Sequence, residues 1–294
     1  MPLDVKKLRD GVTIADGAWG TELDKRGVPP GYCREEWNIS HPDVVEAVAA
    51  AYVEAGSQII LTNTFSGNRF VLDRHGFGDR AAEFSRAGAA ISRKAAGRKA
   101  HVFGSIGPSG RILMMGEVGE DELYDAFKTQ AVALAEGGAD AIICETMTEL
   151  AEALIALRAA KENTTLPVAV SLTYDSGPDR TQTVMGVTPR QAAEELTAAG
   201  ADIVGCNCGA GIENYITVTR LLRKATDLPI WVKANAGMPE LQDGKVVYKD
   251  TPEVFAAKVP RLIDAGANIV GGCCGTSPAH IVAIRRVLGS RRSG

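Results

Sequence analysis

Short apolar segments recur eight times along the chain, and each is bounded by residues typical of turns. Their apolar residues occupy consecutive positions rather than alternating ones, which is the pattern of strands covered on both faces. The segments span residues 12–16, 59–64, 102–107, 141–146, 167–173, 202–208, 229–235 and 268–274. The pattern therefore predicts eight buried strands of the kind found in parallel sheets.

Helical patterns separate these strands. Two helices are expected to begin where Thr188 precedes Pro189 and where Thr251 precedes Pro252, because an N-cap residue is often followed by proline at the first helical position. The clearest helical segments are residues 43–56, 122–138, 188–200 and 251–266. The chain thus alternates between strand and helix.

A weak internal repeat precedes every second strand and supports this alternation. It appears as EAGSQII, EGGADAII, AAGADIV and DAGANIV, and each copy places a glycine between the end of a helix and the start of a strand. Eight such alternations in 294 residues predict an α/β fold, the (β/α)8 TIM barrel, as one domain over residues 1–294. An open doubly wound sheet is the alternative, but the segment after the first strand matches its phosphate fingerprint poorly.

The longest segments without a helical pattern all follow predicted strands. In a barrel they would be loops over the C-terminal mouth, where active sites lie. These segments are residues 67–80, 174–187 and 236–250.

Composition narrows the classes of function. The net charge of -4 and the lack of a long run of like charges do not favour nucleic-acid binding. No apolar stretch approaches the roughly 20 residues that span a bilayer, and the N-terminus lacks the apolar region of a secretory signal. We therefore expect a soluble, cytoplasmic protein. Its six cysteines are then expected to be reduced, and clustered ones indicate a metal site or catalysis.

Three cysteines and an asparagine lie at the ends of the last three predicted strands. Cys208 ends the sixth, Asn235 the seventh, and Cys273 and Cys274 the eighth. Because a barrel brings the carboxyl ends of its strands to one mouth, these side chains can converge. Three thiolates with a replaceable oxygen donor are typical of a catalytic zinc site. A buried thiol cluster without metal is the alternative.

The remaining cysteines are interpreted differently. Cys144 and Cys206 are expected to act as small buried hydrophobes, and Cys33 lies in a polar loop outside the cluster. Cys206 and Cys208 share a strand face about 6.6 Å apart, so only Cys208, nearer the mouth, should reach a metal. Adjacent cysteines reach one metal only if the strand ends there, and the surrounding glycines provide that backbone freedom.

Asp16, Thr64 and Glu145 also lie at predicted strand ends. Two interpretations of Asp16 and Glu145 stay open: ordinary helix caps, or groups that bind a substrate. In the second, Glu145 pairs with a substrate ammonium while the backbone N–H groups of residues 16–18 hold its carboxylate. The four histidines share no metal-ligand spacing and receive no catalytic role.

Seven motifs resemble the homocysteine S-methyltransferase domain over about residues 12–286. They are DGAWGTEL (16–23), TNTFSGNR (62–69), GSIGPSG (104–110), ETM (145–147), GCNCGAG (205–211), NAGMPEL (235–241) and GGCCGTSP (271–278). The pair of NC and GGCCGT is the most specific feature. The last two motifs are most similar to the homocysteine module of cobalamin-dependent methionine synthase.

The resemblance implies a function for each matched residue. It implies that Zn²⁺ binds to Cys208, Cys273 and Cys274, with the Asn235 oxygen in the fourth position until a substrate thiolate replaces it. It also implies that Glu145, Asp16 and Gly17 hold the amine and carboxylate of homocysteine, with Thr64 nearby. Trp19 departs from the commoner DGAMGT pattern and is expected to reshape the mouth.

The implied reaction forms methionine, and the methyl donor stays open. The resemblance favours methylcobalamin on a corrinoid protein or domain as donor and partner. Betaine and S-methylmethionine, used by other relatives, are the alternatives. A barrel that senses zinc or redox state through its adjacent thiols, without catalysis, is the alternative of another class.

Overall fold

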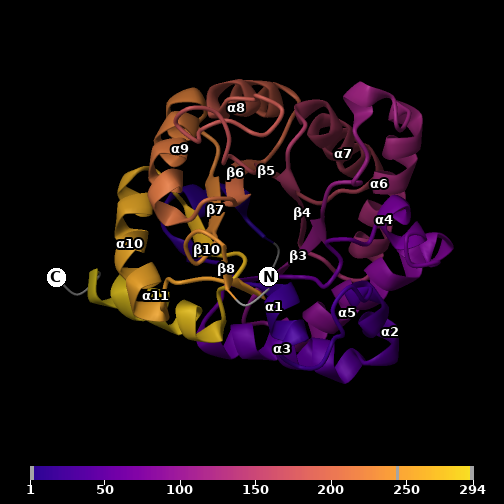
Figure 1. Cartoon of the computed structure of the whole chain (residues 1–294), viewed down its shortest axis with the longest axis horizontal. Coiled ribbons are helices and arrows are strands. Elements are labelled where there is room, and N and C mark those ends of the chain that lie inside the picture. The colour runs from indigo at the N-terminus through magenta and orange to yellow at the C-terminus, as the bar shows by residue number, and fades with distance from the viewer. Residues whose placement is uncertain (1–2, 243–244, 292–294) are drawn as a thin grey trace.

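The computed structural model describes residues 3–242 and 245–291 and forms a barrel of eight parallel strands surrounded by helices (Figure 1). The strands are hydrogen-bonded in the order β1-β10-β7-β6-β5-β4-β3-β2, and a parallel bridge between Ala15 and Ile59 joins the two ends. The strands are β1 (Thr13–Ile14), β2 (Ile59–Leu61), β3 (His101–Ile106), β4 (Ala141–Met147), β5 (Val168–Leu172), β6 (Ile203–Cys208), β7 (Ile230–Ala234) and β10 (Ile269–Gly272). The predicted (β/α)8 TIM barrel is confirmed: six strands lie within the predicted segments, β3 begins one residue before its segment, at His101, and β4 extends one residue beyond its segment, to Met147.

Eight long helices cover the outside of the barrel (Figure 1). They are α3 (Pro42–Ala55), α5 (Ala81–Ala96), α6 (Glu120–Glu136), α7 (Leu150–Asn163), α8 (Pro189–Ala198), α9 (Ile212–Ala225), α10 (Pro252–Asp264) and α11 (Pro278–Arg291). Shorter elements lie in the loops: η1 (Val5–Arg9), α1 (Trp19–Asp24), η2 (Arg34–Glu36), α2 (Trp37–Ser40), α4 (Arg69–Asp73), η3 (Gly78–Arg80), η4 (Leu113–Met115), and the hairpin of β8 (Glu240–Gln242) with β9 (Lys245–Val247).

Local sequence signals set several of these boundaries. The side chains of Thr188 and Thr251 accept hydrogen bonds from backbone N–H groups three residues later, as expected of N-caps before proline. In all four copies of the internal repeat a glycine adopts the left-handed region: φ is 106° at Gly56, 93° at Gly138, 88° at Gly200 and 111° at Gly266. A Cβ is disfavoured there, so the repeat reflects the helix-to-strand turn itself.

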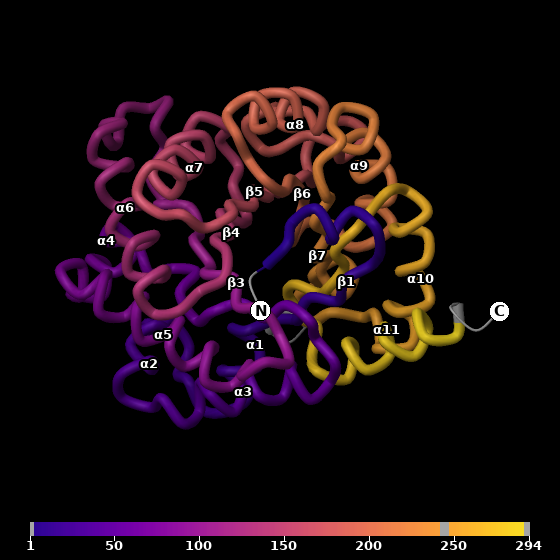
Figure 2. The backbone as a smooth tube through the Cα atoms, turned by 180° about the vertical axis from the view of Figure 1, so that it is seen from behind, coloured from indigo at the N-terminus to yellow at the C-terminus, as the bar shows by residue number. Residues whose placement is uncertain are grey.

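The strands separate two apolar layers. Inward side chains, such as Phe103 and the stacked Trp231, fill the barrel interior. Outward side chains pack against the helices, and this outer layer includes Cys144 and Cys206, both fully buried. The N-terminal segment crosses the end of the barrel seen in Figure 2, and Leu8 of η1 packs against the interior cluster there. The site must therefore lie at the other end.

Two of the predicted loops contain regular structure. Residues 67–80 include the short helix α4, whose N-cap Asn68 accepts a hydrogen bond from the Val71 N–H, and the 3-10 helix η3. Residues 236–250 include the β8–β9 hairpin. Elements of three to five residues show less than two periods of any hydrophobic pattern, so periodicity did not reveal them. None of the helices in the described part of the chain is long and apolar enough to cross a membrane.

Candidate metal centre and substrate cavity

The three cysteines of the predicted metal site converge at the C-terminal end of the barrel. The sulfur atoms of Cys208, Cys273 and Cys274 all lie within 4.8 Å of one another. Among the described residues, these three cysteines form a group of side chains that lie close enough together to hold a metal ion. All six cysteines are free thiols, so the adjacent pair forms no disulfide.

Cys208 reaches this cluster through an unusual backbone conformation. Its φ is 66°, in the left-handed region that a residue with a side chain rarely adopts. The expectation that Cys206 and Cys208 share a strand face is therefore wrong in detail. Cys206 packs in the outer core, whereas Cys208 lines the cavity at the mouth. Strain of this kind concentrates at functional sites.

The adjacent cysteines lie in a turn, because β10 ends at Gly272. The Cys273 N–H donates to the Ala234 carbonyl at 2.7 Å, and the Cys274 carbonyl accepts from the Ala236 N–H at 3.0 Å, so both cysteines are tied to the end of β7. Gly271 and Gly272 serve close packing here: a Cβ on Gly271 would lie 2.7 Å from the Asp16 carbonyl oxygen.

Asn235 follows β7 and contributes an amide beside Cys208. Its Nδ2 donates to the Gly209 carbonyl at 2.7 Å, while its buried Oδ1 has no hydrogen-bond partner. The asparagine side chain adds a hydrogen bond to those from Cys273 and Cys274, which lower the pKa of the Cys208 thiol most strongly. A buried oxygen without a partner is costly in an ordinary core and is expected where a ligand binds.

The three sulfurs interact electrostatically. Hydrogen bonds with Cys273 and Cys274 lower the pKa of the Cys208 thiol, whereas hydrogen bonds with Cys208 and Cys274 raise the pKa of the Cys273 thiol. Burial and the neighbouring Cys274 sulfur raise the pKa of Tyr248, which packs on the same turn: a Cβ on Gly275 would lie 2.3 Å from Tyr248 Cγ. Nothing in the sequence pattern had singled out Tyr248.

A cavity of about 500 Å³ lies beside the cysteines. Its wall includes the three sulfur-bearing residues and three of the other predicted site residues, Gly17, Thr64 and Glu145. Thr64 is fully buried, and its hydroxyl donates to the Ser105 carbonyl at 2.7 Å, which ties the loop after β2 to β3. Cys33 and His75, which the sequence pattern left without a functional role, also line this cavity.

Asp16 is fully buried, and protein groups bind both of its carboxylate oxygens. Oδ2 accepts from the indole N–H of Trp19 and from the Leu61 N–H, both at 2.7 Å. Oδ1 pairs with the ammonium of Lys233. Trp19 and Lys233 line the cavity, so Asp16 is connected to the cavity through them.

Lys233 is the main residue of this site that sequence reasoning missed. It is 2% exposed on β7, where its ammonium lies near the carboxylates of Asp16 and Glu145. Burial opposes its charge, but those two carboxylates outweigh burial and raise the pKa of Lys233. The available signal was a lysine within the apolar run PIWVKAN. A charged residue in a covered strand needs buried partners.

Glu145 is buried at the end of β4. Its Oε1 accepts from the Ser105 hydroxyl at 2.5 Å, and burial raises the pKa of its carboxyl group. The next residue, Thr146, is held at a φ of 62° by two hydrogen bonds to the Asn207 side chain, at 2.7 and 2.8 Å. Asn207 thus contacts both non-glycine residues with a left-handed φ on the cavity wall: it is hydrogen-bonded to Thr146 and directly precedes Cys208 in the chain.

The turn after β1 is held by several backbone contacts. Gly272 N–H donates to the Asp16 carbonyl at 2.9 Å, and Ala18 N–H donates to the Thr276 hydroxyl at 3.1 Å. Of the three N–H groups expected to receive a substrate carboxylate, that of Ala18 therefore already has an acceptor. Gly17, between Asp16 and Ala18 in the chain, lines the cavity.

Comparison with known proteins shows which family this chain belongs to. Residues 13–288 match the model of the homocysteine S-methyltransferase family. The chain is 33% identical to methionine synthase from Mycobacterium tuberculosis over 300 residues, and 31% identical to methionine synthase from Mycobacterium leprae over 298 residues. These alignments cover 95% and 94% of this chain but 24% of each relative, so the chain spans about a quarter of their length.

Solved structures share the fold. The metallated form of the homocysteine methyltransferase MmuM from Escherichia coli superposes with a TM-score of 0.81 at 23% identity, covering 96% of this chain and 99% of that one. Its apo form superposes with a TM-score of 0.74 at 22% identity, covering 94% and 95%. The match of the family model over nearly the whole chain and the identity to the two curated relatives agree. The chain belongs to the homocysteine S-methyltransferase family.

Proposed function

We propose that this chain transfers a methyl group to the thiol of homocysteine, forming methionine, at a Zn²⁺ ion held by Cys208, Cys273 and Cys274. The observation that carries the proposal is the convergence of three sulfurs within 4.8 Å on the wall of a cavity. A homocysteine methyltransferase with the same fold has been solved in a metallated form, which supports the proposal that this chain binds a metal.

The donor set fits zinc. Thiolates and a carboxamide oxygen are zinc ligands, and three protein sulfurs leave the fourth position of a tetrahedral site exchangeable. The Asn235 Oδ1, buried without a partner, supports its role as the displaceable fourth ligand. Bound here, Zn²⁺ would keep the substrate thiol deprotonated at neutral pH, where a free thiol is mostly protonated.

The charges around the cavity suit an amino acid. With both carboxylates ionised, Asp16, Glu145 and Lys233 carry a net charge of −1, which one ammonium group would balance. Glu145 lines the cavity and accepts from Ser105 with one oxygen, so its other oxygen suits a substrate amine. The substrate carboxylate would then lie against the backbone at Gly17. The amine and the carboxylate share the α-carbon, so holding both of them orients that carbon and presents the sulfur at the other end in one direction.

For the methyl donor we propose methylcobalamin on a corrinoid protein or domain. The NAGMPEL and GGCCGT motifs favour it, as do the two methionine synthase relatives. Exposed apolar side chains at the mouth suit a protein donor: Met114 and Met115 after β3 are 73% and 71% exposed, and Leu241 of β8 is 75% exposed. A small donor such as betaine or S-methylmethionine would need no such surface.

One experiment tests metal and donor together. Purified protein is assayed for bound metal and for methionine formation from homocysteine with methylcobalamin, betaine or S-methylmethionine. We expect one zinc per chain and turnover with methylcobalamin. Turnover with the small donors alone would contradict the corrinoid donor. Bound zinc without turnover on any donor would favour the sensing barrel instead.

The ligands are tested with a matched pair of variants. Cys208→Ala is expected to lose zinc and turnover together, because two protein sulfurs hold zinc poorly. Cys206→Ala serves as the control, since Cys206 lies on the same strand but packs in the outer core. It should retain one zinc per chain. Retention of zinc and turnover in Cys208→Ala would contradict the ligand assignment.

A further inference from the structure

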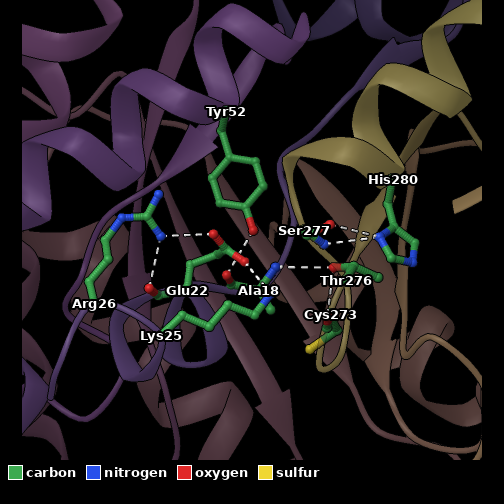
Figure 3. Close-up of polar contacts among 9 residues, drawn as sticks. All are labelled: Ala18, Glu22, Lys25, Arg26, Tyr52, Cys273, Thr276, Ser277 and His280. Atoms are coloured by element: carbon green, nitrogen blue, oxygen red, sulfur yellow. Dashed lines mark hydrogen bonds and ion pairs between the residues drawn. The ribbon is translucent and has the colours of Figure 1, made fainter. Parts of the chain in front are cut away.

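One buried side chain, that of Thr276, links the turn after β1 to the turn after β10 (Figure 3). The Ala18 N–H donates to Thr276 Oγ1 at 3.1 Å, and the Thr276 hydroxyl donates to the Cys273 carbonyl at 2.7 Å. An N–H can only donate and a carbonyl can only accept, so the orientation of the hydroxyl between them is fixed. Thr276, which lies 258 positions after Ala18 in the sequence, thus connects the turn after β1 to Cys273.

Two glycines allow this contact. A Cβ on Gly17 would lie 2.8 Å from Thr276 Oγ1, and a Cβ on Gly272 would lie 2.4 Å from the same atom. Real Cβ atoms do not approach an oxygen so closely, so both positions need glycine if Thr276 is to stay where it is. The hydroxyl is therefore confined as well as hydrogen-bonded.

Tyr52 of α3 binds the carbonyl group of the same residue, Ala18. Its hydroxyl donates to the Ala18 carbonyl at 2.7 Å, and Figure 3 shows the ring pointing from α3 toward Ala18. Together with the bond from Gly272 N–H to the Asp16 carbonyl, these contacts fix both ends of the turn from outside. They leave Gly17, at its centre, on the cavity wall.

We propose that Thr276 is a positioning residue that sets the separation between the sulfur site and the turn that receives the substrate carboxylate. This inference rests on the proposed function, in which homocysteine is bound through its thiol at one end and its carboxylate at the other. A molecule of fixed length can bind two anchors at once only if the distance between the anchors matches the distance between its own two groups. Thr276 bonds to both of them.

Replacement of Thr276 by valine isolates this role. Valine retains the shape but not the hydroxyl, so the Ala18 N–H loses its acceptor. The Cys273 carbonyl still accepts from the Thr276 backbone N–H at 3.1 Å, so the turn of the metal site keeps its own bond. We expect zinc-loaded Thr276→Val to retain one zinc per chain and to bind homocysteine about tenfold more weakly.

A truncated substrate distinguishes positioning from general damage. Homocysteine without its carboxylate is 3-aminopropane-1-thiol, which retains the thiol and the amine. Dissociation constants of both thiols are measured by calorimetry on the zinc-loaded wild type and Thr276→Val. If Thr276 positions the turn that binds the carboxylate, the substitution should raise the dissociation constant of the truncated thiol by less than about twofold.

Two controls accompany this measurement. Thr276→Ser restores a hydroxyl and is expected to recover most of the lost affinity. Thr219→Val removes the hydroxyl of an equally buried threonine on α9, beside Cys206 and away from the cavity, and should bind both thiols as the wild type does. Tyr52→Phe, which releases the Ala18 carbonyl, should show the same selective loss and replaces Thr276→Val if that variant does not fold.

The outcomes separate this inference from the function on which it rests. Equal losses for the two thiols, or no loss for either, would overturn the role of Thr276 while leaving the methyltransferase intact. A wild type that binds zinc but not homocysteine would overturn both. A loss confined to homocysteine, with zinc content unchanged, is the result expected.

Discussion

At the scale of single residues, a fully buried ion pair distinguishes the site from the rest of the described molecule. Lys233 and Asp16 form an ion pair in which both side chains are at most 3% exposed. The other described ion pairs involve more exposed partners, such as Lys94 with Glu46 at 2.7 Å, where the lysine side chain is 71% exposed. Removal of one partner of a buried ion pair is costly, because the remaining charge is left without a partner and cannot be solvated by water.

Removal of the buried ammonium should therefore be costly. Lys233→Met leaves two carboxylates, Asp16 and Glu145, close together without their cation. We expect the free energy of unfolding to fall by about 3–5 kcal/mol, measured by urea denaturation. Lys94→Met removes an exposed lysine and should cost less than about 1 kcal/mol. Similar losses in the two variants would contradict the importance of burial.

At the scale of elements, the first turn of α7 holds the loop that follows β3. Glu149 accepts hydrogen bonds from the Leu113 and Met114 N–H groups at 3.1 and 3.0 Å, and Glu152 accepts from the Ser109 N–H at 2.7 Å. These acidic side chains lie at a helix N-terminus, where the helix dipole favours negative charge. Strands and long helices could be predicted from periodicity, but such links between a helix and a loop could not.

The buried Glu152 should give the stability a defined pH dependence. Burial raises the pKa of this carboxyl group above its ordinary value of 4.5, so the folded state binds its proton more tightly than the unfolded state does. The stabilising contribution is complete below pH 4.5 and is lost as the pH rises through the folded-state pKa.

Glu152→Gln should remove this part of the pH dependence. The variant retains an oxygen for the Ser109 N–H and cannot ionise. Relative to the wild type, its free energy of unfolding should improve between pH 4.5 and pH 7, by about 1.4 kcal/mol for each unit of the pKa shift. Urea denaturation across this pH range measures it. Parallel pH profiles of the two proteins would contradict the prediction.

At the scale of the whole molecule, the site joins the two ends of the described chain. β1 pairs with β10 in the sheet, and the turns after these two strands carry Gly17 and the adjacent cysteines. Cys208 and Lys233 come from the neighbouring strands β6 and β7. A ligand that bridges these strands therefore binds only the closed barrel, and its binding energy adds to the stability of the fold.

Zinc should accordingly stabilise the barrel, by an amount that rises with the logarithm of the free zinc concentration once this exceeds the dissociation constant. At a free zinc concentration one hundred times its dissociation constant, we expect about 2.7 kcal/mol of added stability. The measurement is the thermal midpoint in zinc-buffered solutions. In Cys208→Ala the midpoint should not respond to zinc, whereas in Cys206→Ala it should respond as in the wild type. A wild-type midpoint independent of zinc would contradict the proposed metal site.

The sequence by itself determined the barrel and the sulfur cluster. Eight covered strands, four repeated glycine turns and three cysteines at strand ends are local patterns, and the closure of parallel strands brings their carboxyl ends together whatever the details. The three cysteines could therefore be predicted to converge, and their sulfurs do.

Only the tertiary structure decided how the site is supported. The partner of Lys233 lies 217 residues away, and the contact from Ala18 to Thr276 spans 258 residues. Such pairs depend on which strands become neighbours and on distances of a few ångströms within the closed barrel, and no local pattern encodes either. The left-handed φ of Cys208 has the same origin, because the surrounding contacts, rather than the preference of the residue, hold it there.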